Sequence, residues 1–339
     1  LRRTAEEVKP DFWLMGEVIH GDYSRWVNGE TLHSVTNYAL HKALYSGHND
    51  HNYFEIAHTV KYLQNMGNLD LYNFVDNHDV ERIYTKLSNK AHFTPVHILL
   101  YTLPGVPSIY YGSEFGIEGR KERSSDDSLR PALSLDDYET ALGDNPCTAL
   151  IAALGQIRQH TPALSYGSYA ELHLTNRQFA FARDLNDVRV VVTVNNDDNA
   201  ASMDLPAGNA AEYIGALSGQ KVAVHDGRIN VTVLANSGEI WVPAGDMPEY
   251  KPFKVEISVK EEPVADEETI PDDSEAPSSV AEPVHFDPSK SPEDMSVAEL
   301  QAAILAKMTN NGPVTDQMKK TVNENIWHDS LVNWLKSFR

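Results

Sequence analysis

The sequence predicts a multidomain α/β protein, because the pattern of residues changes along its 339 positions. Residues 1–162 alternate short apolar runs with helical stretches, the order expected of parallel β/α units. Residues 163–250 carry β-branched and aromatic runs between Asn, Asp and Gly turns, which predicts an antiparallel sandwich. Residues 251–293 are acidic and contain prolines, and residues 294–339 return to helical spacing. A disordered linker and a small helical bundle are therefore expected after the sandwich.

The first region is predicted to hold strands that end in polar residues, with helices between them. Residues 1–8 are typical of the end of a helix. The strands are expected at 12–18, 33–37, 71–75 and 106–110, and the clearest helices at 53–65, 94–102 and 148–160. Pro162 and Gly167 then break the pattern, and the all-β region begins.

Period-2 alternation and turn residues locate the strands of the all-β region. They are expected at 178–183, 189–195, 200–205, 228–234 and 239–243. The linker that follows has its densest charge at 261–275, where acidic residues occur without Lys or Arg. Repulsion between like charges, together with few apolar groups, leaves little to offset the entropy of ordering, so disorder is expected to about residue 292.

The last region begins with a capping signal. Ser296 is followed three residues later by Glu299, and apolar residues then recur along one helical face at Val297, Leu300, Ile304 and Met308. Asn311-Gly312-Pro313 is expected to end this helix. Two more amphipathic helices are predicted beyond it, with Val314, Met318, Val322, Leu331 and Leu335 on their apolar faces and Trp327, Trp334 and Phe338 as core residues.

Two predicted strands end on carboxylates. Glu17 follows the apolar run 12–15, and Asp79 closes the run Phe74-Val75-Asp76-Asn77-His78-Asp79. Parallel strands in a barrel present their carboxyl ends on one face, so residues distant in sequence can meet there. Cleavage of a glycosidic bond needs such a pair of carboxyl groups. A single acid after a strand is also a common turn former or helix cap, and that interpretation stays open for each residue alone.

Three segments together resemble one family. GEVIHG at 16–21, FVDNHD at 74–79 and GVPSIYYGSE at 105–114 are similar to the fifth, seventh and eighth strand segments of the α-amylases of glycoside hydrolase family 13, and they occur in the same order. The resemblance implies that residues 1–162 form the C-terminal half of a (β/α)8 TIM barrel, with strands 5 to 8. It also implies an antiparallel C-terminal domain beside the barrel.

The resemblance implies roles for individual residues. Glu17 would be the acid/base, which protonates the leaving oxygen and then activates water. Asp79 would stabilise the transition state by binding hydroxyls of the distorted sugar. Asn77 and His78 would contact substrate, although a strand-end histidine can instead be satisfied by a backbone carbonyl.

Asp126 and Arg130 lie in SSDDSLRPAL, a segment that resembles a loop holding the next sugar in many family members. An Asp and an Arg four residues apart could equally form a solvated ion pair. Both interpretations are kept.

The family mechanism also needs a nucleophilic Asp on the fourth strand, in a Gly-x-Arg-x-Asp-like segment. These 339 residues contain no such segment. We therefore expect this chain to be the C-terminal portion of a longer enzyme and to be inactive alone, since an open half-barrel exposes unpaired strand edges.

The resemblance predicts a retaining α-glucan hydrolase acting on starch or malto-oligosaccharides. An α-glucan glycosyltransferase of the same family is an alternative, and so is a non-catalytic barrel used for glucan binding or assembly. No cofactor is evident. Calcium is implied only by the family, whose usual ligands are expected outside this chain. The histidine-containing run 47–52 is predicted to be a solvated loop and not a metal site.

Charge and composition limit the classes of partner that this protein is expected to bind. The net charge of −21 disfavours nucleic acid and anionic membranes as partners, whereas a neutral glucan meets no such repulsion. The sequence has no apolar run long enough to span a membrane, which requires about 20 residues. The single cysteine, Cys147, excludes an intrachain disulfide. Localisation stays open between cytoplasmic and secreted, and the helical segment 294–339 could dock on the same protein or on another.

Overall fold

The computed structural model describes residues 1–245, 290–292, 295–311 and 335. The chain divides into two compact units, Leu1–Ile257 and Ser258–Arg339. The predicted linker lies almost wholly outside the described residues, as do the two helices predicted after residue 311. No described helix is long and apolar enough to cross a membrane.

Short parallel strands run in chain order through the first part of the larger unit. β1 (Met15–Gly16) pairs with β2 (Ser34–Val35), and β3 (Tyr72–Phe74) pairs with β4 (Val106–Ser108). A parallel bridge between Thr36 and Tyr72 joins the two pairs. The strand predicted in each of the four ranges is therefore confirmed, although each is shorter than predicted.

Helices lie between and after these strands. Their bounds are α1 (Arg2–Val8), α2 (Tyr38–Asn49), α3 (Tyr53–Gln64), α4 (Ile83–Lys86), α5 (Phe93–Thr102), α6 (Ala141–Asp144), α7 (Pro146–His160) and α8 (Pro162–Tyr166). Short 3-10 turns occur at Tyr23–Arg25, Lys90–His92, Ser113–Phe115, Asp127–Leu129 and Leu135–Tyr138. The predicted helices at 53–65, 94–102 and 148–160 are confirmed, whereas α2 was not predicted. Asn37 starts α2 by accepting a hydrogen bond from the Leu40 amide at 3.1 Å.

The prediction of a solvated loop at 47–52 is wrong for its first half. Residues 47–49 form the last turn of α2, and the side chain of His48 is fully buried. Its Nδ1 donates to the Leu44 carbonyl at 2.7 Å, which leaves Nε2 to accept from the Tyr53 hydroxyl at 3.2 Å. A Cβ at Gly47 would lie 2.9 Å from Ile56, so α3 packs too closely there for a loop open to solvent.

An antiparallel sheet follows the helices. Its strands are β5 (Ser168–Leu174), β6 (Gln178–Leu185), β7 (Val188–Asn195), β9 (Glu212–Gly215), β10 (Lys221–Ala223) and β12 (Ser237–Pro243), in the spatial order β10-β9-β12-β7-β6-β5. β8 (Ala201–Pro206) and β11 (Arg228–Val233) pair separately. Strands occur in all the predicted ranges, and β5, β9 and β10 were not predicted.

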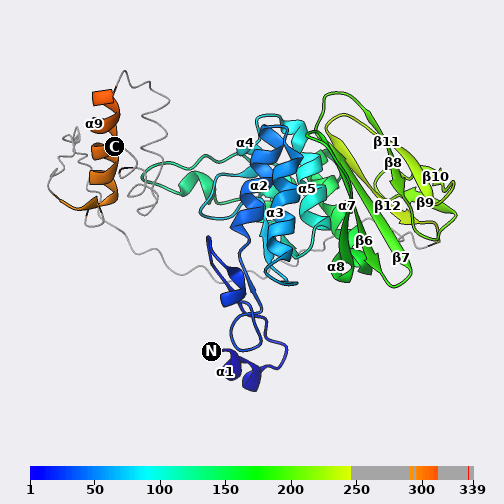
Figure 1. The fold of residues 1–339 in the computed structure, drawn as a ribbon, viewed down its shortest axis with the longest axis horizontal. Helices are drawn as coiled ribbons and strands as arrows, with labels where there is room; N and C mark the ends of the chain where they lie inside the picture. The colour runs from blue at the N-terminus through cyan, green and yellow to red at the C-terminus, as the bar shows by residue number, and fades with distance from the viewer. Residues whose placement is uncertain (246–289, 293–294, 312–334, 336–339) are drawn as a thin grey trace. The chain divides into compact units, whose positions relative to one another are not determined.

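The two faces of this sheet have different partners. Phe179, Phe181 and Val192 pack with residues of α2, α3, α5 and α7 in one apolar cluster. The alternate residues Ala180 and Trp241 face β8 and β11 in a second cluster. Successive side chains of a strand point to opposite faces, so the sheet is a middle layer between helices and a strand pair (Figure 1).

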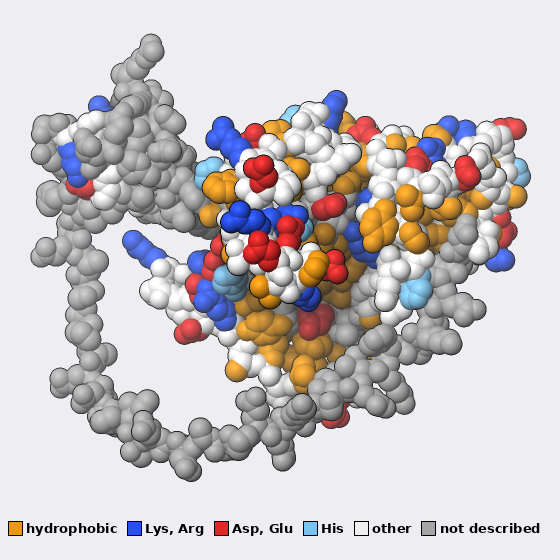
Figure 2. Space-filling model, turned by 90° about the horizontal axis from the view of Figure 1, so that it is seen from below, with side chains coloured by type: hydrophobic (Ala, Val, Ile, Leu, Met, Phe, Trp, Pro, Cys, Tyr) orange, Lys and Arg blue, Asp and Glu red, His pale blue; other side chains and the backbone are white. Residues whose placement is uncertain are grey.

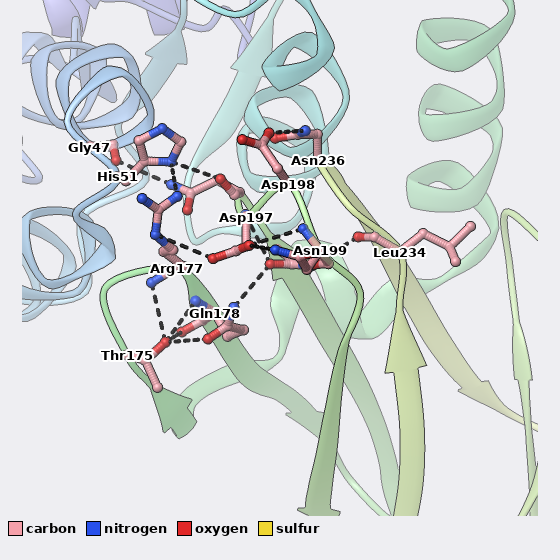
Figure 3. A network of polar contacts seen from close by, with 12 residues as sticks. Gly47, His51, Thr175, Arg177, Gln178, Asp197, Asp198, Asn199, Leu234 and Asn236 are labelled. Atoms are coloured by element: carbon pink, nitrogen blue, oxygen red, sulfur yellow. Dashed lines mark hydrogen bonds and ion pairs between the residues drawn. The ribbon is translucent and has the colours of Figure 1, made fainter.

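A polar network also joins the α2–α3 connection to the β-region (Figure 3). His51 Nδ1 lies 2.8 Å from the Asn196 carbonyl oxygen and 2.8 Å from Arg177 Nη1. These two contacts are alternatives, because one ring nitrogen cannot donate and accept at once. Arg177 Nε also pairs with an Asp197 carboxylate oxygen at 3.3 Å. The helices and the sheet therefore meet through polar contacts as well as an apolar core.

Buried histidines are expected to make the stability of this unit pH dependent. Burial lowers the pKa of His48 to about 3 and of His97 to about 4, so both are neutral in the folded state. In the unfolded chain both histidines bind protons below about pH 6.5. Their stabilising contribution to the free energy of unfolding is therefore complete above that pH and is lost as pH falls toward 4. His97→Leu should reduce the slope of unfolding free energy against pH by about 1.4 kcal/mol per pH unit between pH 6 and 5.

Urea unfolding at several pH values measures this slope. His160→Gln is the control, because that histidine lies on the surface of α7. Equal slopes for wild type and His97→Leu would contradict the expectation.

In the smaller unit, α9 (Val297–Asn311) begins with the predicted capping box. The Ser296 amide donates to a Glu299 carboxylate oxygen at 2.7 Å, and the Glu299 amide donates to Ser296 Oγ at 3.3 Å. The first of these bonds, with help from Lys290, lowers the pKa of Glu299 to about 2. The predicted start of this helix and its extent to Asn311 are confirmed.

Candidate active site

Glu17 stands at the end of β1, on the surface. The adjacent backbone is held by the Val18 amide, which donates to Thr36 Oγ1 at 2.9 Å. The Tyr38 hydroxyl donates to Glu17 Oε1 at 2.8 Å and accepts from Asn77 Nδ2 at 3.1 Å. One tyrosine therefore links the ends of two different strands.

Tyr38 stays a neutral donor at ordinary pH. Burial is the main reason that the pKa of its hydroxyl rises to about 12, and the nearby Glu17 and Asp79 carboxylates add to the increase. The ring packs edge-on against Phe74, with 4.9 Å between centroids. The hydroxyl is thus held in place toward Glu17.

Asn77 shapes the turn that carries Asp79. Its Oδ1 accepts from the Asp79 amide at 2.9 Å and from the Val80 amide at 3.1 Å. Both polar atoms of the Asn77 side chain therefore make hydrogen bonds within the protein, because Nδ2 donates to the Tyr38 hydroxyl. The observed contacts make Asn77 a support for the turn, and substrate contact by Asn77 stays a prediction from the resemblance.

Arg130 pairs with two of the predicted acidic residues, Asp79 and Asp126. Its Nη2 lies 2.7 Å from Asp79 Oδ1 and 3.1 Å from Asp126 Oδ2. Its Nε donates to the His78 carbonyl at 3.0 Å. Lys121 also pairs with Asp126 at 2.6 Å and is the main reason that the pKa of that carboxyl is lowered. The ion pair between Asp126 and Arg130 forms, and it continues to Asp79.

His78 lies beside the same carboxylate. Its Nε2 is 3.4 Å from Asp79 Oδ2, and half of its side chain is exposed. Exposed polar groups on Asp79, His78 and Arg130 thus gather around one point near Glu17. Such an array can bind hydroxyl groups of a neutral sugar.

Exposed apolar side chains occur on the segments around the outer strands. Phe12, Trp13 and Met15 are each 40–45% exposed, and Val106 of β4 is 38% exposed. Figure 2 shows a face on which hydrophobic side chains gather beside a mixed group of acidic and basic ones. β1 and β4 are the outer strands of the four, so within the described residues no neighbouring strand pairs with their outer edges.

Sequence reasoning missed a buried polar network beneath Asp79. Asp76 is 1% exposed and Arg82 is fully buried, and both contact Ser113. The available signal was a carboxylate that directly follows Phe74 and Val75 at the end of the predicted strand 71–75.

The described residues contain no group of three or more His, Cys, Asp or Glu arranged to hold a metal ion. Calcium therefore stays an expectation from the family resemblance.

Residues 1–166 match the family model described as the catalytic domain of alpha amylase. Residues 1–166 belong to the α-amylase family. The match covers β1 to β4 and the residues of the candidate site. It also accounts for the order of the three sequence motifs.

Relatives in this family have several activities. The chain is 26% identical over 250 residues to neopullulanase 2 of Thermoactinomyces vulgaris, covering 70% of this chain and 41% of that protein. It is 28% identical over 180 residues to a cyclomaltodextrin glucanotransferase of Niallia circulans, covering 51% of this chain and 24% of that one. The chain thus spans less than half the length of these α-amylase family relatives.

Solved structures support the fold. An Anoxybacillus α-amylase superposes with a TM-score of 0.62 at 21% identity, covering 74% of this chain and 55% of that one. A cyclomaltodextrin glucanotransferase with a three-domain ABC distribution gives 0.63 at 22% identity, covering 71% and 52%. The chain therefore shares the fold of part of the α-amylase catalytic domain, which is a TIM barrel, and an antiparallel β-sheet follows it.

Proposed function

We propose that this α-amylase family chain is the C-terminal part of a retaining α-glucan hydrolase that acts on starch or malto-oligosaccharides. In this proposal β1 to β4 are the fifth to eighth strands of the barrel. The observation that carries it is the pair of carboxylates at two strand ends, Glu17 and Asp79, linked through Tyr38 and Asn77.

Glu17 is assigned the acid/base role. In the first step its proton passes to the glycosidic oxygen as the bond from that oxygen to the anomeric carbon breaks, and a carboxylate nucleophile bonds to that carbon. In the second step Glu17 takes a proton from water, and the water oxygen displaces the nucleophile. The nucleophile would be supplied by residues outside this chain, since no Gly-x-Arg-x-Asp segment occurs in it.

Asp79 is assigned to the sugar ring. Its carboxylate would accept hydrogen bonds from ring hydroxyls, and these bonds would strengthen as the ring flattens toward the oxocarbenium-like transition state. Arg130 fixes the carboxylate from one side, with 2.7 Å between Nη2 and Oδ1. We assign Asn77, His78, Asp126 and Arg130 to substrate binding.

A glycosyltransferase is the second candidate, and the cyclomaltodextrin glucanotransferases among the relatives favour it. The two reactions share the same first step and differ in whether water or a sugar hydroxyl accepts the glycosyl group. The net charge of −21 is compatible with both reactions, because both use a neutral glucan, which a negatively charged chain does not repel.

The test is product analysis with the protein expressed from its complete gene. Incubation with maltoheptaose, with and without excess glucose as acceptor, should give shorter malto-oligosaccharides that keep the α configuration at the new reducing end. Malto-oligosaccharides that incorporate isotope-labelled glucose added as acceptor would identify the transferase. Residues 1–339 alone should give no robust starch hydrolysis, and turnover by that chain would overturn the proposal that the nucleophile lies elsewhere.

A further inference from the structure

A buried carboxylate lies directly below the turn that carries Asp79. Asp76 Oδ2 accepts from the Ile83 amide at 2.7 Å, and Ser113 Oγ lies 2.8 and 2.9 Å from its two carboxylate oxygens. Burial raises the pKa of Asp76, while the bonds from Ile83 and Ser113 and the charge of Arg82 oppose that rise. An ionisable group buried in this way is costly unless its partners are fixed.

A buried arginine holds the neighbouring loop. Arg82 Nη1 donates to the Tyr111 carbonyl at 2.6 Å and to Ser113 Oγ at 3.1 Å, and Nη2 donates to the Leu129 carbonyl at 2.7 Å. The guanidinium carbon also lies 4.3 Å from the ring centroid of Tyr110. Arg82 thus fixes the backbone at Leu129, one residue before Arg130.

These contacts close a ring around Asp79. On one side Asp76 anchors the turn three residues before Asp79, and on the other Arg82 anchors the backbone of Arg130, which pairs with Asp79 at 2.7 Å. Ser113 completes the ring, because its hydroxyl can accept from Arg82 and donate to Asp76.

We propose that Asp76 and Arg82, joined through Ser113, are positioning residues that set the Asp79 carboxylate and the Arg130 guanidinium for substrate. The proposal rests on the proposed function of Asp79. Neither buried residue touches substrate, and both act through the exposed pair above them. A displacement of about 1 Å at such a site can cost about 10²-fold in rate, so the ring matters for catalysis as well as for folding.

The test is a double-mutant cycle on turnover of maltoheptaose by the protein from the complete gene. Arg82→Gln should lower kcat by about 10²-fold, with a smaller rise in KM. In an Arg130→Ala background the same substitution should have a much smaller further effect, because Arg82 reaches Asp79 chiefly through Arg130, whose guanidinium is gone. Independent, additive losses would overturn the proposal.

Arg158→Gln is the matched control. This arginine of α7 is also largely buried and also donates to three backbone carbonyls, those of Tyr101, Leu164 and Gly105. It should lower the melting temperature and leave kcat of the folded enzyme near wild type. A purely structural role for Arg82 would give the same result as Arg158, and that outcome would overturn the proposal.

A milder pair of variants covers the case in which Arg82→Gln does not fold. Ser113→Ala breaks the ring with a small change of volume, and Ser113→Thr keeps the hydroxyl. Loss of kcat in the first and its recovery in the second is the expected result. Equal kcat in both at the wild-type value would contradict the proposal.

Hydrogen exchange separates this inference from the proposed function. The Asp79 and Val80 amides bond to Asn77 Oδ1, so their protection reports the turn directly. Their exchange should accelerate in Ser113→Ala and not in Arg158→Gln, even if the wild-type protein cleaves no glucan. Unchanged exchange in Ser113→Ala would contradict the positioning role. Absence of glucan turnover by the wild-type protein would contradict only the proposed function.

Discussion

Substituting Glu17→Gln in the complete enzyme is expected to lower turnover of an unactivated malto-oligosaccharide by about 10²–10⁴-fold, the usual contribution of a general acid or base. The reason is that an amide cannot protonate the leaving oxygen. The geometry should survive, because the amide oxygen can still accept from the Tyr38 hydroxyl, which lies 2.8 Å from Glu17 Oε1.

The measurement compares two substrates. An α-glucosyl fluoride needs no protonation of its leaving group, so its first step should be nearly unaffected by Glu17→Gln. Glu30→Gln is the control, since that carboxylate is also exposed but lies in the loop before β2. Near-normal turnover of the unactivated substrate by Glu17→Gln would remove Glu17 from the acid/base role.

Asp79→Asn should lower kcat by about 10²–10³-fold, the range seen when one group that stabilises transition-state charge is removed. The substitution keeps the shape and an oxygen that can accept from Arg130, but it removes the negative charge beside the sugar ring. Unlike the change at Glu17, this loss should be as large with the fluoride as with the unactivated substrate, because the ring passes through the same charged state in both.

The loss of turnover on each of the two substrates therefore distinguishes the role of Glu17 from that of Asp79. Asp204→Asn controls for loss of an arginine-paired surface carboxylate, since Asp204 pairs with Arg228 on the β8 and β11 pair. If the activated substrate restored turnover in Asp79→Asn, Asp79 would act on the leaving group, and the two assignments would have to be exchanged.

The sequence alone determined the features that depend on nearby residues. Apolar runs that end in polar residues located β1 to β4. Of these strands β2 and β3 are mostly buried, whereas residues of the outer strands β1 and β4 are exposed. The spacing of Ser296 and Glu299 located the start of α9, because a capping box is complete within four neighbouring residues. Three motifs in order carried the family resemblance.

The tertiary structure decided the contacts between segments far apart in the chain. Arg130 meets Asp79 across 51 positions, and Ser113 meets Asp76 across 37. Residue patterns report which side chains are apolar and how they repeat, whereas such pairings depend on how strands and loops are placed beside one another. The burial of His48 was missed for this reason, because the packing of α2 against α3 decides it.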